Sequence, residues 1–518
     1  MRYLYSDIDR KNVGWFENDA ESKSLKSINL VQGQIRGLYP CTINFNYPIA
    51  AIAGENGSGK STILAMACCA YHNSDAGYIP SDRNKSYYTF SDFFVQTKDE
   101  VKVEGIYIRY GIFARWNDGQ IKIGYQRRRK KRGGKWTKYD KRVKRNVIFL
   151  GIQRIVPPGE RKTERSYSGR FKSSKLDHST QKKILDIASK ILGKKYTTLD
   201  MRTVDKRRLF VVDRKEKHYS GFNMGAGENA VFSLLIELFS AGRNTLLVID
   251  EIELGLHESA QKRLINELKK LCVELHCLVI CSTHSSVILY QLPPEGRFYL
   301  EVCNEKTNII SHISPRYAMG KLSGGEKKEL TVFVEDGVGE SILRGLLSSE
   351  VLRRIRIISI GSDQAVLKQL AAAYRESNNS CMAFCDGDKR LEYNKAITQV
   401  KKHLETRVGE DVDEWIQCRL KYLPGDVWPE KYSLETIEDS TFIREELFEL
   451  WKVEKDHDDE IIERALQSGK HNEFYYLAEQ LNQDEEQVKM DVIRMVGKII
   501  PEEVQSMEND IKVLLEYC

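Results

Sequence analysis

The chain has 518 residues, of which 41% are hydrophobic and 30% charged, and its formal net charge is +6. Such a length suits two to four globular domains, each with its own buried core. No apolar run reaches the roughly 18 residues of a membrane-spanning helix, and the N-terminus lacks the apolar core of a secretory signal. The eleven cysteines do not show the spacing of a disulfide framework or a zinc site. We therefore expect a cytoplasmic protein with reduced thiols and no membrane partner.

The charges are distributed unevenly along the chain. Residues 127–145 contain twelve Lys and Arg against one acid, whereas residues 441–518 contain twenty Asp and Glu against nine Lys and Arg. Segments of opposite charge attract different partners. The basic segment favours a polyanion, and the acidic tail favours a protein surface.

A glycine-rich loop near the N-terminus has the pattern of a phosphate-binding site. The apolar run IAAIA is followed by GENGSGKS at residues 54–61 and then by helix-forming sequence. In the motif G-x-x-x-x-G-K-[ST], backbone N–H groups surround the phosphates, the lysine reaches the terminal phosphates and the hydroxyl binds Mg²⁺. The predicted ATP-binding residues are Gly54, Glu55, Asn56, Gly57, Ser58, Gly59, Lys60, Ser61 and Thr62, with Ser61 also on the metal.

Two later strands end in residues that suit ATP hydrolysis. The apolar run TLLVI is followed by Asp250 and Glu251, where the first acid would hold Mg²⁺ and the second would polarise the attacking water. The run CLVICST is followed by His284, which we place near the γ-phosphate. An isolated histidine is more often structural, but its position after the acidic pair favours catalysis. Gln96 is the first candidate for a glutamine that senses Mg²⁺, and Gln153 is the alternative. Neither has a specific spacing, and a plain surface or strand-end glutamine is the more common interpretation of each.

With these motifs in this order, residues 1–320 resemble the SMC/RecF/OLD branch of ABC ATPases. The resemblance implies hydrolysis at composite sites, so that the chain self-associates as a dimer or a larger even-numbered oligomer. Such a site needs a signature loop at a helix N-terminus of the second copy. LSGGE at residues 322–326 is the closer match to the LSGGQ motif of ABC ATPases, but it comes after His284 in the chain. We predict that MGAGE at residues 224–228 is the signature, through Gly225, Gly227 and Glu228.

The residues after 328 resemble the Toprim domain that OLD-family proteins join to such an ATPase. ELTVFVEDGVGE and CMAFCDGDKR each read as a strand followed by acids. The resemblance implies that Glu335, Asp386 and Asp388 hold Mg²⁺. Glu340 lies five residues after Glu335, whereas the family pattern has a spacing of four. Acids after strands also cap helices and turns, so an active metal site and a vestigial one remain equal alternatives.

The basic segment alternates as strands separated by turn sequences, which predicts a β-ribbon. Cationic and aromatic side chains on such a ribbon suit a nucleic-acid backbone and exposed bases. A solvated hairpin or a dock for an acidic partner is the alternative. The predicted nucleic-acid residues are Arg127, Arg128, Arg129, Lys130, Lys131, Arg132 and Trp136.

Together these features predict an α/β protein. It would contain an ABC-type ATPase domain over residues 1–320 with a β-ribbon insertion at about 101–156, a Toprim-like domain over 328–435 and an acidic helical region over 436–518. VEDGVGE, DGDKR and LPGDVWPEK are also similar to the PtuA ATPases of Septu-type and retron-linked antiphage systems. That resemblance implies an ATPase subunit that controls nucleic-acid cleavage, by a separate HNH nuclease or by its own Toprim-like site. A self-contained OLD-type Mg²⁺-dependent DNA nuclease and a RecF-like DNA-repair ATPase are the alternatives.

Overall fold

The computed structural model divides the chain into two compact units, Tyr3–Gly325 and Glu326–Cys518, which we call the N-terminal and C-terminal units. It describes all residues except 1–2, 74–76, 98, 101–102, 132–135, 137–141, 157–159, 161–168, 175–176, 205–206, 216, 323–327, 405–408, 410, 454–457 and 518. The mixed α/β class predicted from the sequence is confirmed. No described helix combines the length and the apolar character that crossing a bilayer requires.

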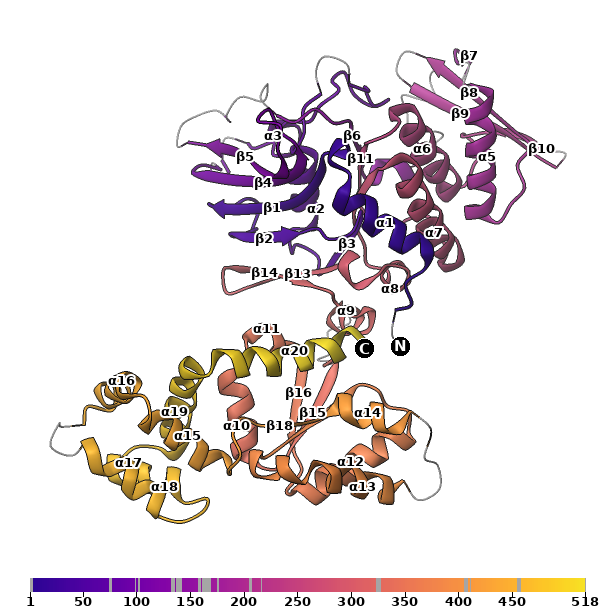
Figure 1. The fold of residues 1–518 in the computed structure, drawn as a ribbon. Coiled ribbons are helices and arrows are strands. Elements are labelled where there is room, and N and C mark those ends of the chain that lie inside the picture. Colours follow the sequence, from indigo (N-terminus) through magenta and orange to yellow (C-terminus); the bar gives the residue numbers. More distant parts are fainter. Residues whose placement is uncertain are drawn as a thin grey trace. The chain divides into compact units, whose positions relative to one another are not determined.

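A six-stranded sheet forms the centre of the N-terminal unit (Figure 1). Its order is β14 (Lys306–Ser311), β13 (Arg297–Cys303), β3 (Ile49–Gly54), β12 (Leu278–Ser282), β11 (Leu246–Ile249) and β6 (Val147–Leu150). All neighbours are parallel except β13 and β14. Strands buried on both faces read as continuous apolar runs, which explains the sequences of β3, β11 and β12.

Each face of this sheet has its own hydrophobic core, because alternate residues of a strand point to opposite faces. Ile49, Ala51 and Ala53 belong to one core, together with α5 (His178–Leu192), α6 (Ala226–Ala241) and α7 (Glu258–Leu275). Ala50 and Ile52 belong to the other core, which includes α2 (Lys60–Cys68). The helix α1 (Asp7–Asn18) lies against α7 and contributes Phe16 to the second core.

The predicted β-ribbon insertion is corrected by the structure. The strands β4 (Ile106–Arg115) and β5 (Ile121–Lys130) do pair antiparallel across the turn at Asn117–Gly119. They continue a four-stranded sheet with β1 (Ser24–Gln32) and β2 (Cys41–Asn44), in the order β2-β1-β4-β5. The last strand of the segment, β6, is instead the edge of the central sheet. The buried inward face of β4 lies over α2, where the Tyr110 hydroxyl donates to the Met66 carbonyl at 2.9 Å.

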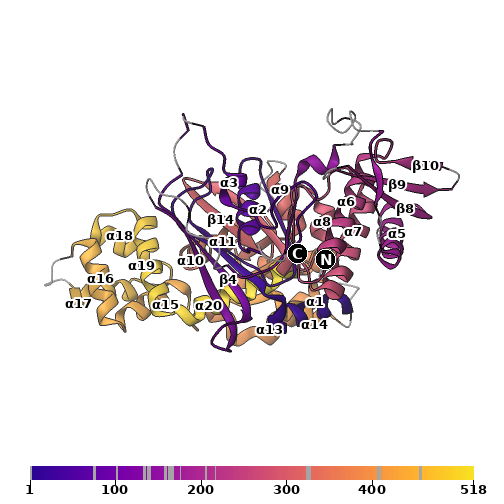
Figure 2. The same cartoon turned by 90° about the horizontal axis from the view of Figure 1, so that it is seen from above.

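A second antiparallel sheet lies next to α5 (Figure 2). It consists of β7 (Lys172–Ser174), β8 (Thr198–Val204), β9 (Arg207–Arg214) and β10 (Lys217–Ser220). We call α5 and these strands the lobe. The chain leaves β10 and enters α6 within six residues, so the lobe adjoins the predicted signature loop.

The C-terminal unit is built on a parallel sheet with the order β16-β15-β17-β18. Its elements are β15 (Leu330–Val334), α10 (Gly337–Leu346), α11 (Ser349–Arg354), β16 (Ile355–Ser359), α12 (Asp363–Arg375), β17 (Cys381–Cys385), α13 (Tyr393–His403), α14 (Val412–Arg419) and β18 (Leu420–Tyr422). The strands are apolar and the connecting helices amphipathic, which is the arrangement of a βαβ fold.

Six helices complete the C-terminal unit: α15 (Pro429–Glu438), α16 (Thr441–Trp451), α17 (Asp458–Gln467), α18 (Glu473–Leu481), α19 (Glu485–Ile499) and α20 (Pro501–Tyr517). The predicted acidic tail is therefore helical. It also shares a core with the sheet, because Ile493 of α19 and Ile511 of α20 pack with Val332 and Phe384. Gly345 of α10 allows α19 to approach, since a Cβ there would lie 2.5 Å from Ile493 Cγ2.

Candidate functional site

The phosphate-binding loop follows β3 and leads into α2, as predicted. Gly57 and Gly59 have φ values of +81° and +99°, which glycine adopts without strain. A Cβ at Gly54 would lie 2.4 Å from the Leu300 carbonyl oxygen, so the loop also depends on close packing against β13. Lys60 Nζ donates to the Gly54 and Glu55 carbonyls at 2.7 and 2.9 Å. Burial lowers the pKa of Lys60.

Asp250 lies beside this loop because β3, β12 and β11 are parallel neighbours and their carboxyl ends meet at one edge. Its carboxylate accepts a hydrogen bond from Ser61 Oγ at 3.2 Å and from Ser282 Oγ at 2.6 Å. Adjacent hydroxyl and carboxylate oxygens are hard ligands that suit Mg²⁺ bound to a nucleotide. The side chains of Ser61 and Asp250 thus fit the predicted metal role.

Glu251 has the environment of a general base. Its φ is +50°, and its backbone N–H donates to Ser282 Oγ at 2.7 Å, which fixes the turn after β11. The carboxylate lies 3.4 Å from His284 Nε2. Burial, followed by the charge of Glu253, raises the pKa of Glu251 to about 7. Burial and the charge of Lys60 lower the pKa of His284. A base with a pKa near neutrality is well matched to proton transfer at neutral pH.

Glu253 links this pair to the next strand. Its carboxylate accepts from the Thr283 hydroxyl at 2.7 Å and from the His284 N–H at 2.6 Å. Glu253 is not among the site residues predicted from the sequence. The structure assigns it a definite position, because it orients His284 toward Glu251.

Arg154 is a site residue that the sequence reasoning missed. Its guanidinium donates to the Asp250 and Glu251 carbonyls at 2.5 Å each and to the Leu150 and Gly151 carbonyls at 3.2 and 3.1 Å. Burial lowers its pKa. One cation therefore joins the ends of β6 and β11. A signal was available, since Arg154 is the only charged residue in the apolar sequence FLGIQRIVPP.

The same strand pairing favours Gln153 over Gln96 as the sensing glutamine. Gln153 lies in the 3₁₀ turn after β6 (Ile152–Ile155), next to β11. Gln96 lies on an exposed loop after α3 (Phe90–Phe93), where its side-chain oxygen accepts from the Val103 N–H at 3.2 Å. Gln96 and Gln153 both stay candidates, and the position beside β11 makes Gln153 the one we propose.

The MGAGE segment lies at the N-terminus of α6, as predicted for a signature loop. Gly225 is the N-cap residue, and a Cβ there would meet no atom closer than 3.9 Å. Gly227 packs tightly, since a Cβ would lie 2.1 Å from the Gly255 carbonyl oxygen. The competing LSGGE segment lies largely outside the described residues, except Leu322 at the end of α9 (Pro315–Leu322).

Glu228 points into the protein, which corrects its predicted direct contact with ATP. Its carboxylate accepts from Lys194 Nζ at 2.8 Å, from the Tyr196 hydroxyl at 2.5 Å and from the Gly225 N–H at 3.2 Å. Burial opposes ionisation, but the hydrogen bonds from Lys194 and Tyr196 outweigh it and lower the pKa of Glu228. Glu228 therefore holds the signature loop against the lobe.

A second group of carboxylates lies in the C-terminal unit, at the carboxyl ends of β15 and β17. Glu335 Oε1 accepts from the Asp386 N–H at 2.9 Å. Asp386 Oδ1 and Asp388 Oδ1 are buried and have no hydrogen-bond partner among the described residues. Burial and the charge of Glu335 raise the pKa of Asp386 to about 8. Unpartnered buried oxygens suit a divalent cation, although no three ligand-type side chains among the described residues already form a complete metal-binding group.

The structure adds residues to this group that the sequence did not single out. Lys470 Nζ lies 3.2 Å from Asp388 Oδ2. The buried Glu430, at the start of α15, pairs with His471 Nδ1 at 2.9 Å and contributes to the raised pKa of Asp386. Glu340 does not join them, because it pairs with Arg344 Nη2 at 2.7 Å. We call Glu335, Asp386, Asp388, Glu430 and Lys470 the carboxylate cluster.

The basic segment only partly matches its prediction. Arg127 and Arg129 are exposed on β5, and Lys130 and Lys131 are at least partly exposed. Arg128 is buried. Trp136 is half-buried and stacks on Phe90, with ring centroids 3.9 Å apart. The predicted nucleic-acid roles of Arg128 and Trp136 are thus corrected, because strand alternation and core packing turn them inward. Arg132 lies outside the described residues.

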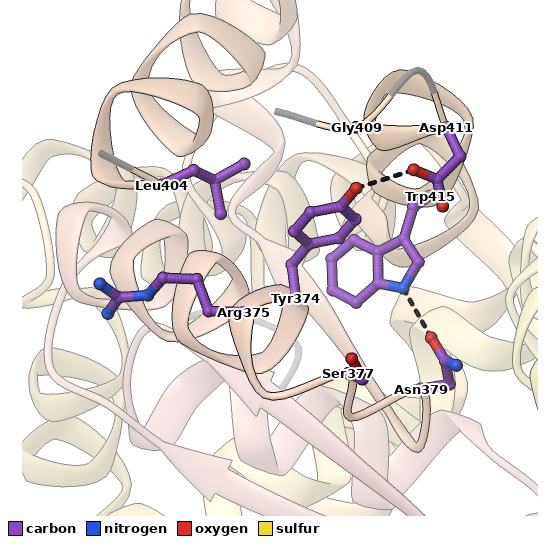
Figure 3. Close-up of a pocket in the computed structure, with 8 residues that line it drawn as sticks. All are labelled: Tyr374, Arg375, Ser377, Asn379, Leu404, Gly409, Asp411 and Trp415. Atoms are coloured by element: carbon purple, nitrogen blue, oxygen red, sulfur yellow. Dashed lines mark hydrogen bonds between the residues drawn. The ribbon is translucent and has the colours of Figure 1, made fainter. Parts of the chain in front are cut away.

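A pocket of about 490 Å³ lies between α12 and α14 (Figure 3). The Tyr374 hydroxyl donates to Asp411 Oδ1 and Trp415 Nε1 donates to Asn379 Oδ1, both at 2.8 Å. Asn379 precedes β17, so the pocket lies at the amino end of the sheet, away from Asp386. These two bonds join polar groups of the lining to one another, and we assign the pocket no chemistry.

Comparison with known proteins gives one family match and several solved structures. Residues 158–289 match the family model described as AAA ATPase domain. The SMC head domain from Thermotoga maritima is 17% identical and aligns over 55% of this chain and 98% of that chain, with a TM-score of 0.36. A Pyrococcus furiosus Smc head, bound to the C-terminal domain of ScpA, is 13% identical over 58% and 98% of the two chains, with a TM-score of 0.37.

The C-terminal region of the Xanthomonas campestris pv. campestris OLD protein is 15% identical over 36% of this chain and 96% of that chain, with a TM-score of 0.24. No curated protein matches the chain. The matched ATPase domain includes Asp250, Glu251 and His284. Since these residues meet the phosphate-binding loop at one sheet edge, the chain is an ATP hydrolase.

Proposed function

We propose that this chain is the ATPase subunit of a bacterial antiviral defence system, in which ATP hydrolysis controls the cleavage of nucleic acid. The observation that carries the proposal is the presence of two acidic sites in one chain. Asp250 and Glu251 adjoin the phosphate loop, and the carboxylate cluster occupies the carboxyl end of a second parallel sheet. The first site suits ATP and the second suits a phosphodiester.

The ATP step would use two copies of the chain. Lys60, Ser61 and Asp250 would hold the triphosphate and Mg²⁺ in one copy, and the α6 N-terminus of the other copy would close on the γ-phosphate. The open surroundings of Gly225 support this closure, because the nearest side chain that a Cβ there would meet, among the described residues, is Glu228 with its Oε2 at 3.9 Å.

The cleavage step would take place either at the carboxylate cluster or in a partner HNH nuclease. Mg²⁺ at the cluster would activate water and stabilise the departing oxygen of a phosphodiester. The buried oxygens of Asp386 and Asp388 fit such an ion. Lys470, 3.2 Å from Asp388, would place a positive charge beside a bound phosphate.

Plasmid cleavage and phage plating test the proposal together. Wild-type protein, Lys60→Ala and Asp386→Ala would be compared with Glu340→Gln, which alters an acid outside the cluster. We expect Lys60→Ala to abolish phage protection and Glu340→Gln to retain it. Loss of plasmid cleavage and of protection in Asp386→Ala would assign cutting to this chain. Full protection by Asp386→Ala would assign it to a partner nuclease.

One result would overturn the proposal. If deletion of the protein or Lys60→Ala leaves phage plating unchanged and instead makes cells sensitive to DNA damage, the RecF-like repair function is the correct one.

A further inference from the structure

The outer face of β4 and β5 carries an ordered set of aromatic, apolar and basic side chains. Alternate residues of β5 are exposed, beginning with Ile121, Ile123 and Tyr125 at 48%, 46% and 57% and continuing with Arg127 and Arg129. Because the side-chain period of a strand is two, these five residues share one face. Exposed apolar residues in such a row are unusual on a surface with no partner.

Two arginines lie directly opposite each other on this face. Arg109 of β4 is the register partner of Arg127 of β5, and like charges in that position repel. Neither forms an ion pair within the described part of the chain. The Arg109 Nε is buried and has no hydrogen-bond partner in the described ranges of the chain. An anionic ligand from outside the chain would balance the two positive charges of this pair.

Each tyrosine of the face contacts an arginine of the other strand. The Arg109 guanidinium lies 4.8 Å from the Tyr125 ring centroid, and the Arg129 guanidinium lies 4.4 Å from that of Tyr107. Tyr125 is opposite Gly111, which has no side chain to cover the ring. Cation–π contacts of this type hold both partners in place at little cost in entropy on binding. The face therefore offers planar groups and positive charge at fixed positions.

We propose that this Arg–Tyr face, made of Tyr107, Arg109, Tyr125, Arg127 and Arg129, binds single-stranded nucleic acid. The arginines neutralise backbone phosphates, and unpaired bases stack on the tyrosines. A duplex keeps its base faces covered by stacking, so it gains only the phosphate contacts. The inference rests on the proposed function and specifies its ligand: the strand that this protein recognises is one whose bases are exposed.

Charge distinguishes this occupant from a second copy of the chain. In the described part of the chain β5 is the last strand of its sheet, and a sheet edge favours strand pairing. The isoleucines favour apolar contact. In a two-fold symmetric contact, however, each copy presents the same patch to the other. The arginine rows would then meet with no acid from the same face to balance them. A polyanion removes that repulsion.

Fluorescence anisotropy of the full chain with labelled oligonucleotides tests the inference. We expect a single strand of about 30 nucleotides to bind more tightly than a hairpin duplex formed from the same number of nucleotides. Tyr125→Leu should weaken single-strand binding about 5- to 150-fold, as expected for the loss of one stacked base, and leave duplex binding unchanged. Tyr125→Phe should retain affinity. Arg127→Ser should reduce the slope of log affinity against log salt by about 0.7 for a single strand.

Two control variants test specificity. Lys122→Ala alters a cation on the alternate face of β5, and Tyr475→Leu removes an exposed tyrosine from the C-terminal unit. Both should bind like the wild type. Equal affinity for single strand and duplex, or no effect of Tyr125→Leu, would refute the inference. A change confined to the oligomeric state, measured by light scattering, would refute it in favour of a contact between copies.

A failure of this inference can be distinguished from a failure of the proposed function. If phage protection and cleavage persist in Tyr125→Leu with normal strand binding, this face is excluded and the proposed function remains. If the face binds single strands as expected but Lys60→Ala leaves phage plating unchanged, the ligand assignment remains and the antiviral role fails.

Discussion

In the proposed ATP site, Lys60 and Glu251 would contribute to different stages of the ATP cycle. Lys60 would carry the charge that binds the triphosphate, whereas Glu251 would be needed only when water attacks. We expect Lys60→Ala to abolish ATP binding. Glu251→Gln should keep ATP bound and lower the hydrolysis rate by about 10²–10⁴-fold, which is the contribution typical of a general base.

Binding of a fluorescent ATP analogue and phosphate release would be measured on both variants. Size-exclusion chromatography with light scattering would show whether Glu251→Gln accumulates as a closed oligomer with ATP. Equal turnover in wild type and Glu251→Gln would contradict the assignment of the base.

Gly225 gives a second prediction at the residue scale. It occupies the position that Ser323 has in the competing LSGGE segment, and its surroundings can take a side chain. A serine hydroxyl would donate one more hydrogen bond to the γ-phosphate. We expect Gly225→Ser to raise kcat about two- to tenfold, equivalent to one net hydrogen bond, while Gly225→Ala should not. Steady-state ATPase assays of both variants distinguish the hydroxyl from the added bulk.

Substitutions at Gly227 cannot test whether the MGAGE loop contacts the γ-phosphate. Any side chain there meets the Gly255 carbonyl at 2.1 Å, so a loss of activity in Gly227→Asp reports packing within one chain. If Gly225→Ser and Gly225→Ala have the same rate, the MGAGE loop does not contact the γ-phosphate.

At the scale of elements, Arg154 joins β6 to β11 and thereby holds Glu251 in its unusual backbone conformation. Replacing it with methionine leaves the Asp250 and Glu251 carbonyls without their donor. Displacement of a catalytic group by about 1 Å costs roughly 10²-fold in rate. We expect Arg154→Met to lower kcat by about that factor with little change in ATP affinity, and Arg154→Lys to recover part of it.

The separation of kcat from affinity is the decisive measurement for Arg154. A purely structural role would reduce both together and lower the melting temperature seen by circular dichroism. Unchanged kcat in a folded Arg154→Met protein would contradict the positioning role.

The pairing of β15 with β17 brings acids together in a way that destabilises the metal-free protein. The pKa of Asp386 is raised from its usual value near 4 to about 8 by burial and Glu335. The folded state therefore binds more protons than the unfolded state between these values, and stability falls as pH rises through this window. At pH 8 without metal, Asp386→Asn should raise the melting temperature, by about 2–4 °C for each kcal/mol gained.

Mg²⁺ should reverse the order of the melting temperatures of the wild type and Asp386→Asn. An ion that binds only the folded state stabilises it, so the wild type should melt higher with Mg²⁺ while Asp386→Asn should not respond. Glu340→Gln, outside the cluster, should behave like the wild type. Differential scanning fluorimetry with EDTA or Mg²⁺ measures these melting temperatures. If neither Mg²⁺ nor Mn²⁺ changes the melting temperature of the wild type, the carboxylate cluster is vestigial.

The sequence predicted those elements whose signal is local. GENGSGKS forms the phosphate loop, TLLVIDE the adjacent strand and turn, and MGAGE the start of α6. It did not predict which strands pair, because register depends on distant segments. For that reason β4 and β5 were expected as a ribbon insertion and not as part of a four-stranded sheet. Arg154 beside β11 was not predicted, and the half-buried Trp136 was expected on the surface. Lys470 and Glu430 approach Asp386 only through the folding of α15 and α18, which no motif near them reveals.

On the scale of the whole molecule, the proposed composite site requires that each ATP be held by two chains. Lys60→Ala removes the loop contribution of one chain, and Gly225→Asp would place a negative charge against the γ-phosphate while still serving as a helix N-cap. Each variant alone should be inactive. A mixed dimer, however, would contain one site built from the intact loop of one copy and the intact signature of the other.

Equal mixing of the two variants should therefore restore activity. Random pairing makes half of the dimers mixed, and each mixed dimer has one of two sites intact, so about a quarter of wild-type turnover is expected for a closed two-fold assembly. Phosphate release after co-refolding or co-expression measures this recovery. If both halves of the site came from one chain, no mixture could complement, since every chain would carry a defect in its own site. Recovery thus depends on the two-chain arrangement itself and not on either residue alone.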